Sequence, residues 1–270
     1  MKTPLLLFLL CCLLLSCQVE EEETIQKPSP SKEKLVDLSH DFSKETVYWV
    51  TEPDFQLDSG FHGETEKGYY YAANSFCAAE HGGTHIDAPI HFSKTGQTVD
   101  QLPLEKLAGP AIKIDIKERA LQSPDYLISI EDLMQWESQQ GHPIPDQAII
   151  LLETGYAKYY GDKKKYLGTI NKGPEAVKEL HFPGLAPEAA QWLVDERNIN
   201  AVGIDTPSID YGQSTHFQSH VILLGQQIPV FENVNLSMKL PAEGFDIMAF
   251  PMKIKGGSGA PLRIVARIRE

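Results

Sequence analysis

The chain has 270 residues, with 24 basic and 37 acidic side chains and a formal net charge of −13 at pH 7. This acidic balance argues against nucleic acid as a partner and excludes a polybasic patch that would bind a membrane surface. Neither an internal repeat nor a second linker interrupts the chain after residue 33, which favours one large domain over residues 34–270.

Residues 1–16 are predicted to form a signal peptide. Met1-Lys2 is a short positive start, and Leu5–Leu15 is almost purely apolar but too short to span a bilayer as a mature helix. Leu14-Leu15-Ser16-Cys17 resembles a bacterial lipobox, which implies cleavage before Cys17 and lipidation of its thiol. The alternative is an ordinary signal peptide followed by a chance cysteine. With the lipid, the mature protein is expected to be an exported, membrane-anchored lipoprotein of the periplasm, outer membrane or cell surface.

Residues 17–33 are predicted to be a lipidated acidic tether. The run Glu20–Glu23 and the following Pro/Ser-rich residues cannot build a core, so this segment is expected to be solvated. Cys77 is the one cysteine of the globular part, so no intramolecular disulfide is available there. Cys77 is predicted to be a buried core thiol.

Two predicted strands lead to a stretch of unusual polarity. Leu35–Ser39 is typical of a first strand, and Tyr69–Ala79 is rich in residues that favour strands. The stretch His81–Phe92 follows directly and contains three histidines and one carboxylate, with two glycines and a proline between them. Such polar density is costly to bury unless a partner satisfies it, and a metal ion is the obvious partner.

The spacing within this stretch favours a metal site. His81 and His85 are four residues apart, but Gly82-Gly83 between them makes a helix unfavourable and a turn that folds His81 back toward His85 the better interpretation. On an extended segment, His85 and Asp87 share one face. Two imidazoles and a carboxylate suit a divalent ion such as zinc or manganese, with a position left for water. His91 lies further along, where it could act as a general acid/base without binding the ion. The alternative is a loop whose histidines pair with backbone carbonyls or solvent.

The remainder alternates between strands and helices, which predicts the α/β class. Ala111–Ile116 alternates as a strand, and Ile130–Gln140 carries apolar residues at helical spacing up to Gly141. Ala148–Leu152 is an apolar run typical of a strand buried on both faces. A helix is predicted from about Pro187 to Asn198, followed by a buried strand over Ala201–Asp205.

A second polar cluster contains His216 and His220, and Glu232 comes at the end of an apolar segment twelve residues later. Taken alone, either residue is weak evidence. A histidine that enters an apolar helix is more often packed in the core, and a glutamate after a strand is often a cap.

The stretch His81–Phe92 resembles the HxGTHxDxPxH signature of the cyclase family of metal-dependent hydrolases, which includes bacterial kynurenine formamidases and isatin hydrolases. The blocks 203–210, 245–253 and 257–263 are also similar to this family, so the likeness covers about residues 34–270. The resemblance implies a swivelling β/β/α domain and a homodimer or higher homo-oligomer. A nucleophilic serine finds little support, since no Gly-x-Ser-x-Gly elbow is present.

The resemblance also implies roles for single residues. His81 and His85 would bind one ion and His220 a second, with Asp87 and Glu232 as bridging ligands. His91 would be the acid/base and Trp49 an aromatic beside the substrate, although an aromatic residue at such a position is more often part of the packing. His216 matches no ligand position. Segments 155–161 and 182–185 look closer to the isatin hydrolases, which are described with a single manganese. Zinc or manganese, and one ion or two, therefore stay open.

The expected function is metal-dependent hydrolysis of a C–N bond in a small non-peptide amide, with a cyclic amide such as isatin as the leading candidate. Metal-activated water would attack the carbonyl, with His91 as the acid/base. Hydrolysis of N-formylkynurenine, a cytosolic metabolite, is the alternative because export makes that substrate awkward. A metal- or ligand-binding lipoprotein without catalysis is a further alternative, against which an unligated His91 argues.

Overall fold

The computed structural model describes residues 32–269, which belong to one compact unit. The predicted signal peptide over 1–16, most of the tether over 17–33, and Cys17 lie outside the described residues. Among the helices of the described part, none is long and apolar enough to cross a membrane.

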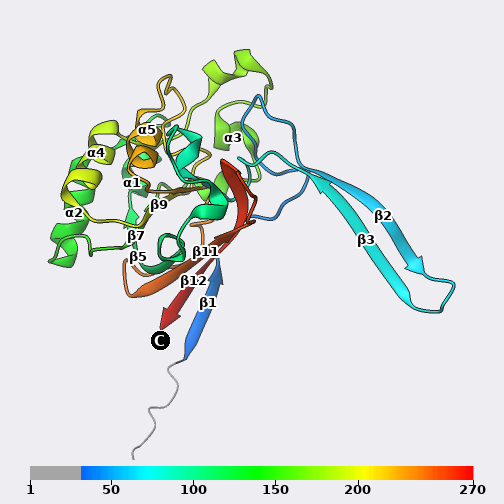
Figure 1. Ribbon diagram of the computed structural model, residues 1–270. Coiled ribbons are helices and arrows are strands. Elements are labelled where there is room, and N and C mark those ends of the chain that lie inside the picture. The colour runs from blue at the N-terminus through cyan, green and yellow to red at the C-terminus, as the bar shows by residue number, and fades with distance from the viewer. Residues whose placement is uncertain (1–31, 270) are drawn as a thin grey trace, which may run out of the picture. The chain divides into compact units, whose positions relative to one another are not determined.

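An eight-stranded mixed sheet organises the unit (Figure 1), in the order β1-β12-β11-β5-β7-β9-β10-β4. Strands β5, β7, β9 and β10 run parallel to their neighbours within that group, and the other pairings are antiparallel. Strand β4 pairs with β12 as well as with β10, so the sheet closes on itself. The strands are β1 (Glu33–Asp37), β2 (Gln56–Glu64), β3 (Tyr70–Cys77), β4 (His85–Asp87), β5 (Ala108–Asp115), β6 (Leu127–Ile128), β7 (Ile149–Glu153), β8 (Gly184–Leu185), β9 (Ala201–Ile204), β10 (Val230–Glu232), β11 (Phe245–Pro251) and β12 (Gly259–Arg269).

Helices gather on the outer face of the parallel part of the sheet, so the mixed α/β class is confirmed (Figure 1). The helices are α1 (Lys117–Ala120), α2 (Ile130–Gln140), α3 (Lys163–Leu167), α4 (Pro187–Glu196) and α5 (Gln218–Gly225). Strand β7 is buried on both faces, as predicted. Its residues Ile150 and Leu152 pack against the helices, whereas Ile149 and Leu151 belong to the core enclosed by the sheet.

Helix α2 has the predicted bounds, and its ends explain why. Ser129 accepts a hydrogen bond from the Asp132 backbone N–H and Asp132 reaches back to the Ser129 N–H, which forms a capping box. Gly141 ends the helix at φ +79°, a left-handed conformation that glycine adopts without a Cβ penalty. Leu133 and Trp136 lie on the buried face of the helix, at 0% and 3% exposed, whereas Met134 is 53% exposed.

The strand predicted over Tyr69–Ala79 is confirmed as β3, but its antiparallel pairing with β2, in a hairpin that extends away from the sheet (Figure 1), was not predicted. Most of its residues are exposed on both faces. Cys77 ends β3 and is exposed, so the prediction of a buried core thiol was wrong. Cys77 is exposed because no second layer of structure covers the hairpin.

Asp205, directly after β9, ties the carboxyl ends of two parallel strands together. Its buried carboxylate accepts hydrogen bonds from Thr154 Oγ1 at 2.6 Å, and from the backbone N–H groups of Thr154 at 2.8 Å, Gly155 at 2.9 Å and Ala157 at 3.3 Å. Asparagine would place an NH₂ group against one set of these donors. We therefore expect Asp205→Asn to lower the free energy of unfolding by about 1–3 kcal/mol in denaturant titrations, and the exposed Asp58→Asn to change it little.

Candidate metal centre

The turn before β4 folds His81 back on the strand, as predicted. A Cβ on Gly82 would lie 2.1 Å from the Tyr48 ring, and Gly83 adopts φ +58°. Only glycine meets both demands at low cost. The turn brings His81 Nδ1 to 2.6 Å from Asp87 Oδ1.

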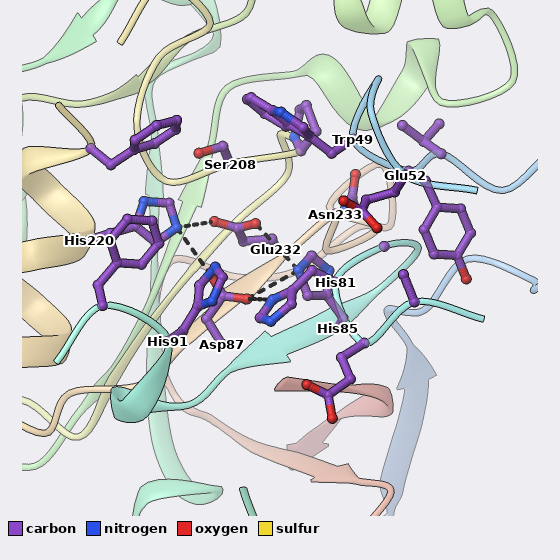
Figure 2. A pocket seen from close by; sticks show the side chains of 18 residues that line it. Trp49, Glu52, His81, His85, Asp87, His91, Ser208, His220, Glu232 and Asn233 are labelled. Atoms are coloured by element: carbon purple, nitrogen blue, oxygen red, sulfur yellow. Dashed lines mark hydrogen bonds and ion pairs between the residues drawn. The ribbon is translucent and has the colours of Figure 1, made fainter. Parts of the chain in front are cut away.

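Strand β4 supplies two buried groups on one face. His85 and Asp87 are 2% and 1% exposed, and His85 Nε2 lies 3.2 Å from Asp87 Oδ1. The neighbouring strand β10 places Glu232 opposite His85 in the antiparallel register, with Glu232 Oε2 3.4 Å from His85 Nε2. Helix α5 adds His220, whose Nε2 lies 3.1 Å from both Asp87 Oδ2 and Glu232 Oε1 (Figure 2). The five predicted ligands therefore converge.

Hydrogen bonds to the far ring nitrogens determine which nitrogens face the centre. His85 Nδ1 donates to the Gly83 carbonyl at 2.9 Å, and His220 Nδ1 donates to Asp210 Oδ2 at 2.6 Å. A carbonyl and an ionised carboxylate can only accept, so Nε2 of both rings is left for a metal. These contacts are the outer partners that orient metal-binding histidines.

His81 has the opposite orientation. Its Nε2 lies 2.9 Å from Ser258 Oγ, and Ser258 Oγ donates to Glu80 Oε2 at 2.7 Å. Because the serine proton is committed to Glu80, His81 Nε2 acts as the donor. His81 Nδ1 therefore faces Asp87 and the centre.

The residues fit a divalent cation. His81, His85 and Asp87 form one group, and Asp87, His220 and Glu232 form another, with the ligand atoms in each within 4.8 Å of one another. Burial and the charge of Asp87 raise the pKa of Glu232. Burial opposes the charge of Asp87, but contacts with the three histidines outweigh it and hold its pKa well below the usual range. Facing carboxylates in a buried site are costly without a cation, and imidazole with carboxylate suits zinc or manganese.

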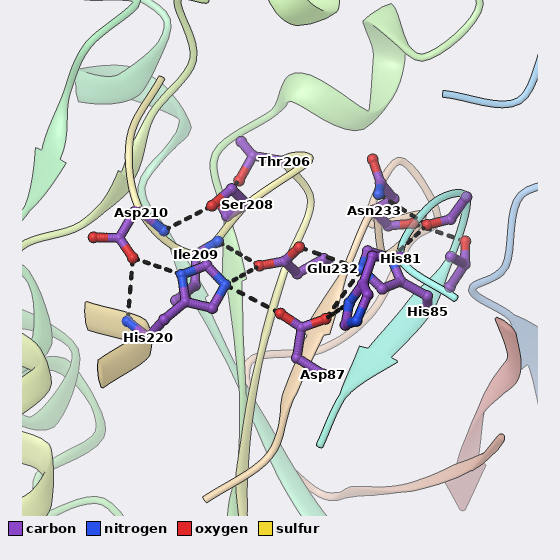
Figure 3. A network of polar contacts seen from close by, with 12 residues as sticks. His81, His85, Asp87, Thr206, Ser208, Ile209, Asp210, His220, Glu232 and Asn233 are labelled. Carbon is purple, nitrogen blue, oxygen red and sulfur yellow. Dashed lines mark hydrogen bonds and ion pairs between the residues drawn. The ribbon is translucent and has the colours of Figure 1, made fainter. Parts of the chain in front are cut away.

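Three supporting residues escaped the sequence analysis. Asp210 accepts from the Ser219 and His220 N–H groups, at 3.2 and 3.1 Å, as well as from the His220 ring (Figure 3). Asn233 donates to the Gly83 carbonyl at 2.8 Å and adopts φ +52°, a rare conformation outside glycine that clusters at functional sites. Asp210 ends one of the family-like blocks and Asn233 follows Glu232, but neither position by itself indicates an outer contact. The third supporting residue is Ser258, whose Oγ contacts His81 Nε2.

His91 lies beside the centre and belongs to neither ligand group. It ends the 3₁₀ turn Pro89–His91, and its ring stacks on His81 with 3.8 Å between centroids. The His91 ring is exposed to the cavity, but the protein atoms around it partly desolvate it and lower its pKa to about 4, and repulsion from the neighbouring imidazoles acts in the same direction. A neutral, unligated imidazole next to the candidate metal position matches the expected acid/base.

The centre forms the floor of a cavity of about 380 Å³ with aromatic walls. Trp49 lines this cavity, as predicted, together with Phe92 and Phe217. The rings of Trp49 and Phe217 are 6.2 Å apart, and those of Phe92 and Phe217 are 5.7 Å apart. His216 is exposed and is not among the lining residues, because Phe217 turns the chain at φ +47° before α5 begins.

A family model described as "Putative cyclase" matches residues 36–211. The fold and the convergent histidine–carboxylate centre are those of a metal-dependent hydrolase. The chain belongs to the cyclase family.

Two curated relatives are each 28% identical to the chain. Isatin hydrolase from Roseibium aggregatum aligns over 264 residues, 94% of both chains. Kynurenine formamidase from Salinibacter ruber aligns over 234 residues, 86% of this chain and 97% of the relative. Among solved structures, isatin hydrolase A from Labrenzia aggregata bound to benzyl benzoate is similar with a TM-score of 0.77 and 32% identity, over 88% of this chain and 94% of that chain.

The outer partner of His220 provides a test of the centre. Asp210→Asn removes the charged acceptor of the His220 ring, so we expect about 10- to 100-fold weaker zinc or manganese binding in competition with a chelator. Asp125→Asn is the matched control, because Asp125 accepts from the exposed His181 Nδ1 at 2.8 Å. Equal metal affinity in both variants would contradict a role for Asp210 in holding His220 toward an ion.

Proposed function

We propose that the pocket hydrolyses a cyclic amide, with isatin as the first candidate. Metal-dependent hydrolysis of a non-peptide amide is the broader activity, supported by family membership and by the relatives named isatin hydrolase and kynurenine formamidase. The observation that carries the proposal is His91, an unligated imidazole beside two metal-binding groups on the floor of an aromatic cavity.

Each part of the site has a task in this reaction. A bound divalent ion lowers the pKa of its water and polarises the carbonyl oxygen. Asp87 and Glu232, with the three histidines around them, would hold the ion. His91 accepts a proton from the attacking water and returns it to the leaving nitrogen. The rings of Trp49 and Phe217 hold a planar substrate over the centre.

We propose zinc or manganese as the ion. Two ions are compatible with the geometry, because Asp87 belongs to both ligand groups and Glu232 contacts both His85 and His220. One ion in the group of His81, His85 and Asp87 would leave His220 and Glu232 as its outer partners.

Metal content and turnover should be measured together on residues 33–270. Zinc and manganese are quantified per chain, and isatin and N-formylkynurenine are assayed with each metal. We expect bound metal and isatin turnover. Formamide turnover without isatin turnover would favour arylformamidase, the second candidate, which the kynurenine formamidase relatives support. Bound metal without any turnover would favour the non-catalytic binder, and failure to bind metal would remove the basis of the proposal.

We propose that the protein is exported and anchored in a membrane through a lipid on Cys17. The support is the apolar run Leu5–Leu15 and the lipobox-like Leu14-Leu15-Ser16-Cys17 at its end. Wild-type protein should take up labelled fatty acid and sediment with membranes, and Cys17→Ser should do neither. Equal membrane association of both would contradict the anchor.

We also propose a homo-oligomer in which the hairpin of β2 and β3 packs on a second copy. Adjacent Tyr70 and Tyr71 are 67% and 51% exposed, so both faces of the hairpin present aromatic rings to solvent. Apolar patches of this kind mark interaction sites, and a stable interface takes about 800 Å² from each partner. The exposed large apolar side chains of this arm are Leu57, Phe61, Tyr69, Tyr70, Tyr71 and Phe76.

The oligomer is tested by analytical ultracentrifugation over a range of concentrations. Wild type and the control Glu66→Gln should sediment as dimers or larger species. The double variant Phe61→Ser/Tyr71→Ser should sediment as a smaller species with unchanged circular dichroism. A monomeric wild type at all concentrations would rule out the proposal.

A further inference from the structure

We infer that Glu52 makes the mouth of the pocket selective for charge. The substrate would be an uncharged or cationic aromatic amide that directs an N–H group or a positive charge toward Glu52, and anionic amides would be excluded. This inference rests on the proposed function, because it concerns the part of the substrate that stays outside the metal centre.

The chain positions Glu52 at the mouth through the same turn that positions Trp49. The Glu52 backbone N–H donates to the Trp49 carbonyl at 2.9 Å, so both side chains belong to one tight turn. Both line the cavity. In Figure 2 the side chain of Glu52 points inward beside Asn233, above the centre formed by His85 and its neighbours.

The Glu52 carboxylate has no hydrogen bond or ion pair with any residue in the range 32–269. Lys172 reaches this loop, but its Nζ contacts the Glu52 backbone carbonyl and Asp54 Oδ1, each at 3.0 Å. Lys163 also pairs with Asp54, at 3.5 Å. The cations of this loop therefore neutralise Asp54 and leave Glu52 available to a ligand.

The cavity as a whole provides no positive side chain to balance Glu52. Among its described lining residues there is neither a lysine nor an arginine. Of the other lining carboxylates, Asp87 and Glu232 face the metal position, and Glu80 accepts from Ser258 N–H and Oγ. With one divalent ion balancing Asp87 and Glu232, the lining carboxylates without a charged partner are Glu52 and Glu80, and of these two only Glu52 also lacks a hydrogen bond among the described residues.

The aromatic wall beside Glu52 favours the same ligand. Trp49 and Phe217 are arranged edge to face, at 63°, and both line the cavity together with Glu52. Aromatic faces attract cations and planar rings, whereas a carboxylate nearby repels anions. A negative substituent at the mouth would therefore face both an unfavourable ring quadrupole and a like charge.

The test is a charge series on one scaffold. Isatin, isatin-5-sulfonate and 5-(trimethylammoniomethyl)isatin are compared by kcat/KM in the wild type, Glu52→Gln and the control Glu188→Gln, whose carboxylate lies on the exposed surface of α4. The ratio of variant to wild type cancels the intrinsic reactivity of each compound. For unit charges several ångströms apart at a partly exposed site, we expect Glu52→Gln to shift the cation-to-anion preference by roughly three- to tenfold toward the anion. The control should leave the preference unchanged.

A binding assay with the same three compounds separates this inference from the proposed function. Binding is measured by the quenching of tryptophan fluorescence. A charge preference in binding that Glu52→Gln reduces supports the inference, even if none of the compounds is hydrolysed and the proposed function fails. Hydrolysis with the same preference in wild type and Glu52→Gln overturns the inference and leaves the function standing. Failure of all three compounds to bind overturns both.

Discussion

Replacement of Asp87 by alanine is expected to abolish metal binding and hydrolysis together. Asp87 is the one carboxylate common to both ligand groups, with Oδ1 facing His81 and His85 and Oδ2 facing His220. Its removal also leaves three imidazoles crowded around a cavity. The loss of affinity should exceed the about 10- to 100-fold effect typical of outer partners, and elemental analysis with kcat measurement would show it.

Asp58→Ala is the control for this variant, because Asp58 lies on the exposed hairpin strand β2. Both proteins should retain the circular dichroism of the wild type. An Asp87→Ala protein that keeps a full complement of metal would show that the centre lies elsewhere.

Replacement of His91 by alanine is expected to separate metal binding from catalysis. His91 stacks on His81 without belonging to either ligand group, so the metal content should match that of the wild type. Loss of a general acid/base lowers turnover by about 10²- to 10⁴-fold. Metal analysis and steady-state rates on the hydrolysed substrate provide the two readouts.

His216→Ala serves as the companion variant, since His216 is exposed and lies outside the cavity lining. It should retain both metal and rate. Near-normal turnover of His91→Ala would exclude the proton-shuttle role, and loss of its metal would show that His91 is a ligand.

Several elements of the fold could be predicted from short stretches of sequence alone. The capping box at Ser129 and the left-handed Gly141 fix α2 from within a short window of sequence. The apolar run over β7 predicted burial on both faces because alternate residues pack into two separate cores. The turn at Gly82-Gly83 and the face shared by His85 and Asp87 were also predicted from neighbouring residues alone.

Other features depend on contacts that no local pattern encodes. The pairing of β4 with both β10 and β12 closes the sheet, yet each partner is more than a hundred residues away. Ser258 contacts His81 across a separation of 177 residues, so neither residue indicates the other. Strand β3 was predicted from residues that favour strands, but its pairing with β2 in an exposed hairpin was not.

The same long separations fix the order in which the centre can be built. Asp87 meets His220 across 133 positions, and a Cβ on Gly259, at the start of β12, would lie 2.6 Å from the His81 ring. The full set of ligands therefore exists only when segments from both ends of the domain are in place. Because ligands that are not yet assembled cannot select an ion, the cation is acquired where folding finishes. We therefore expect the compartment in which the domain folds, and its free metal pool, to influence which ion the site binds.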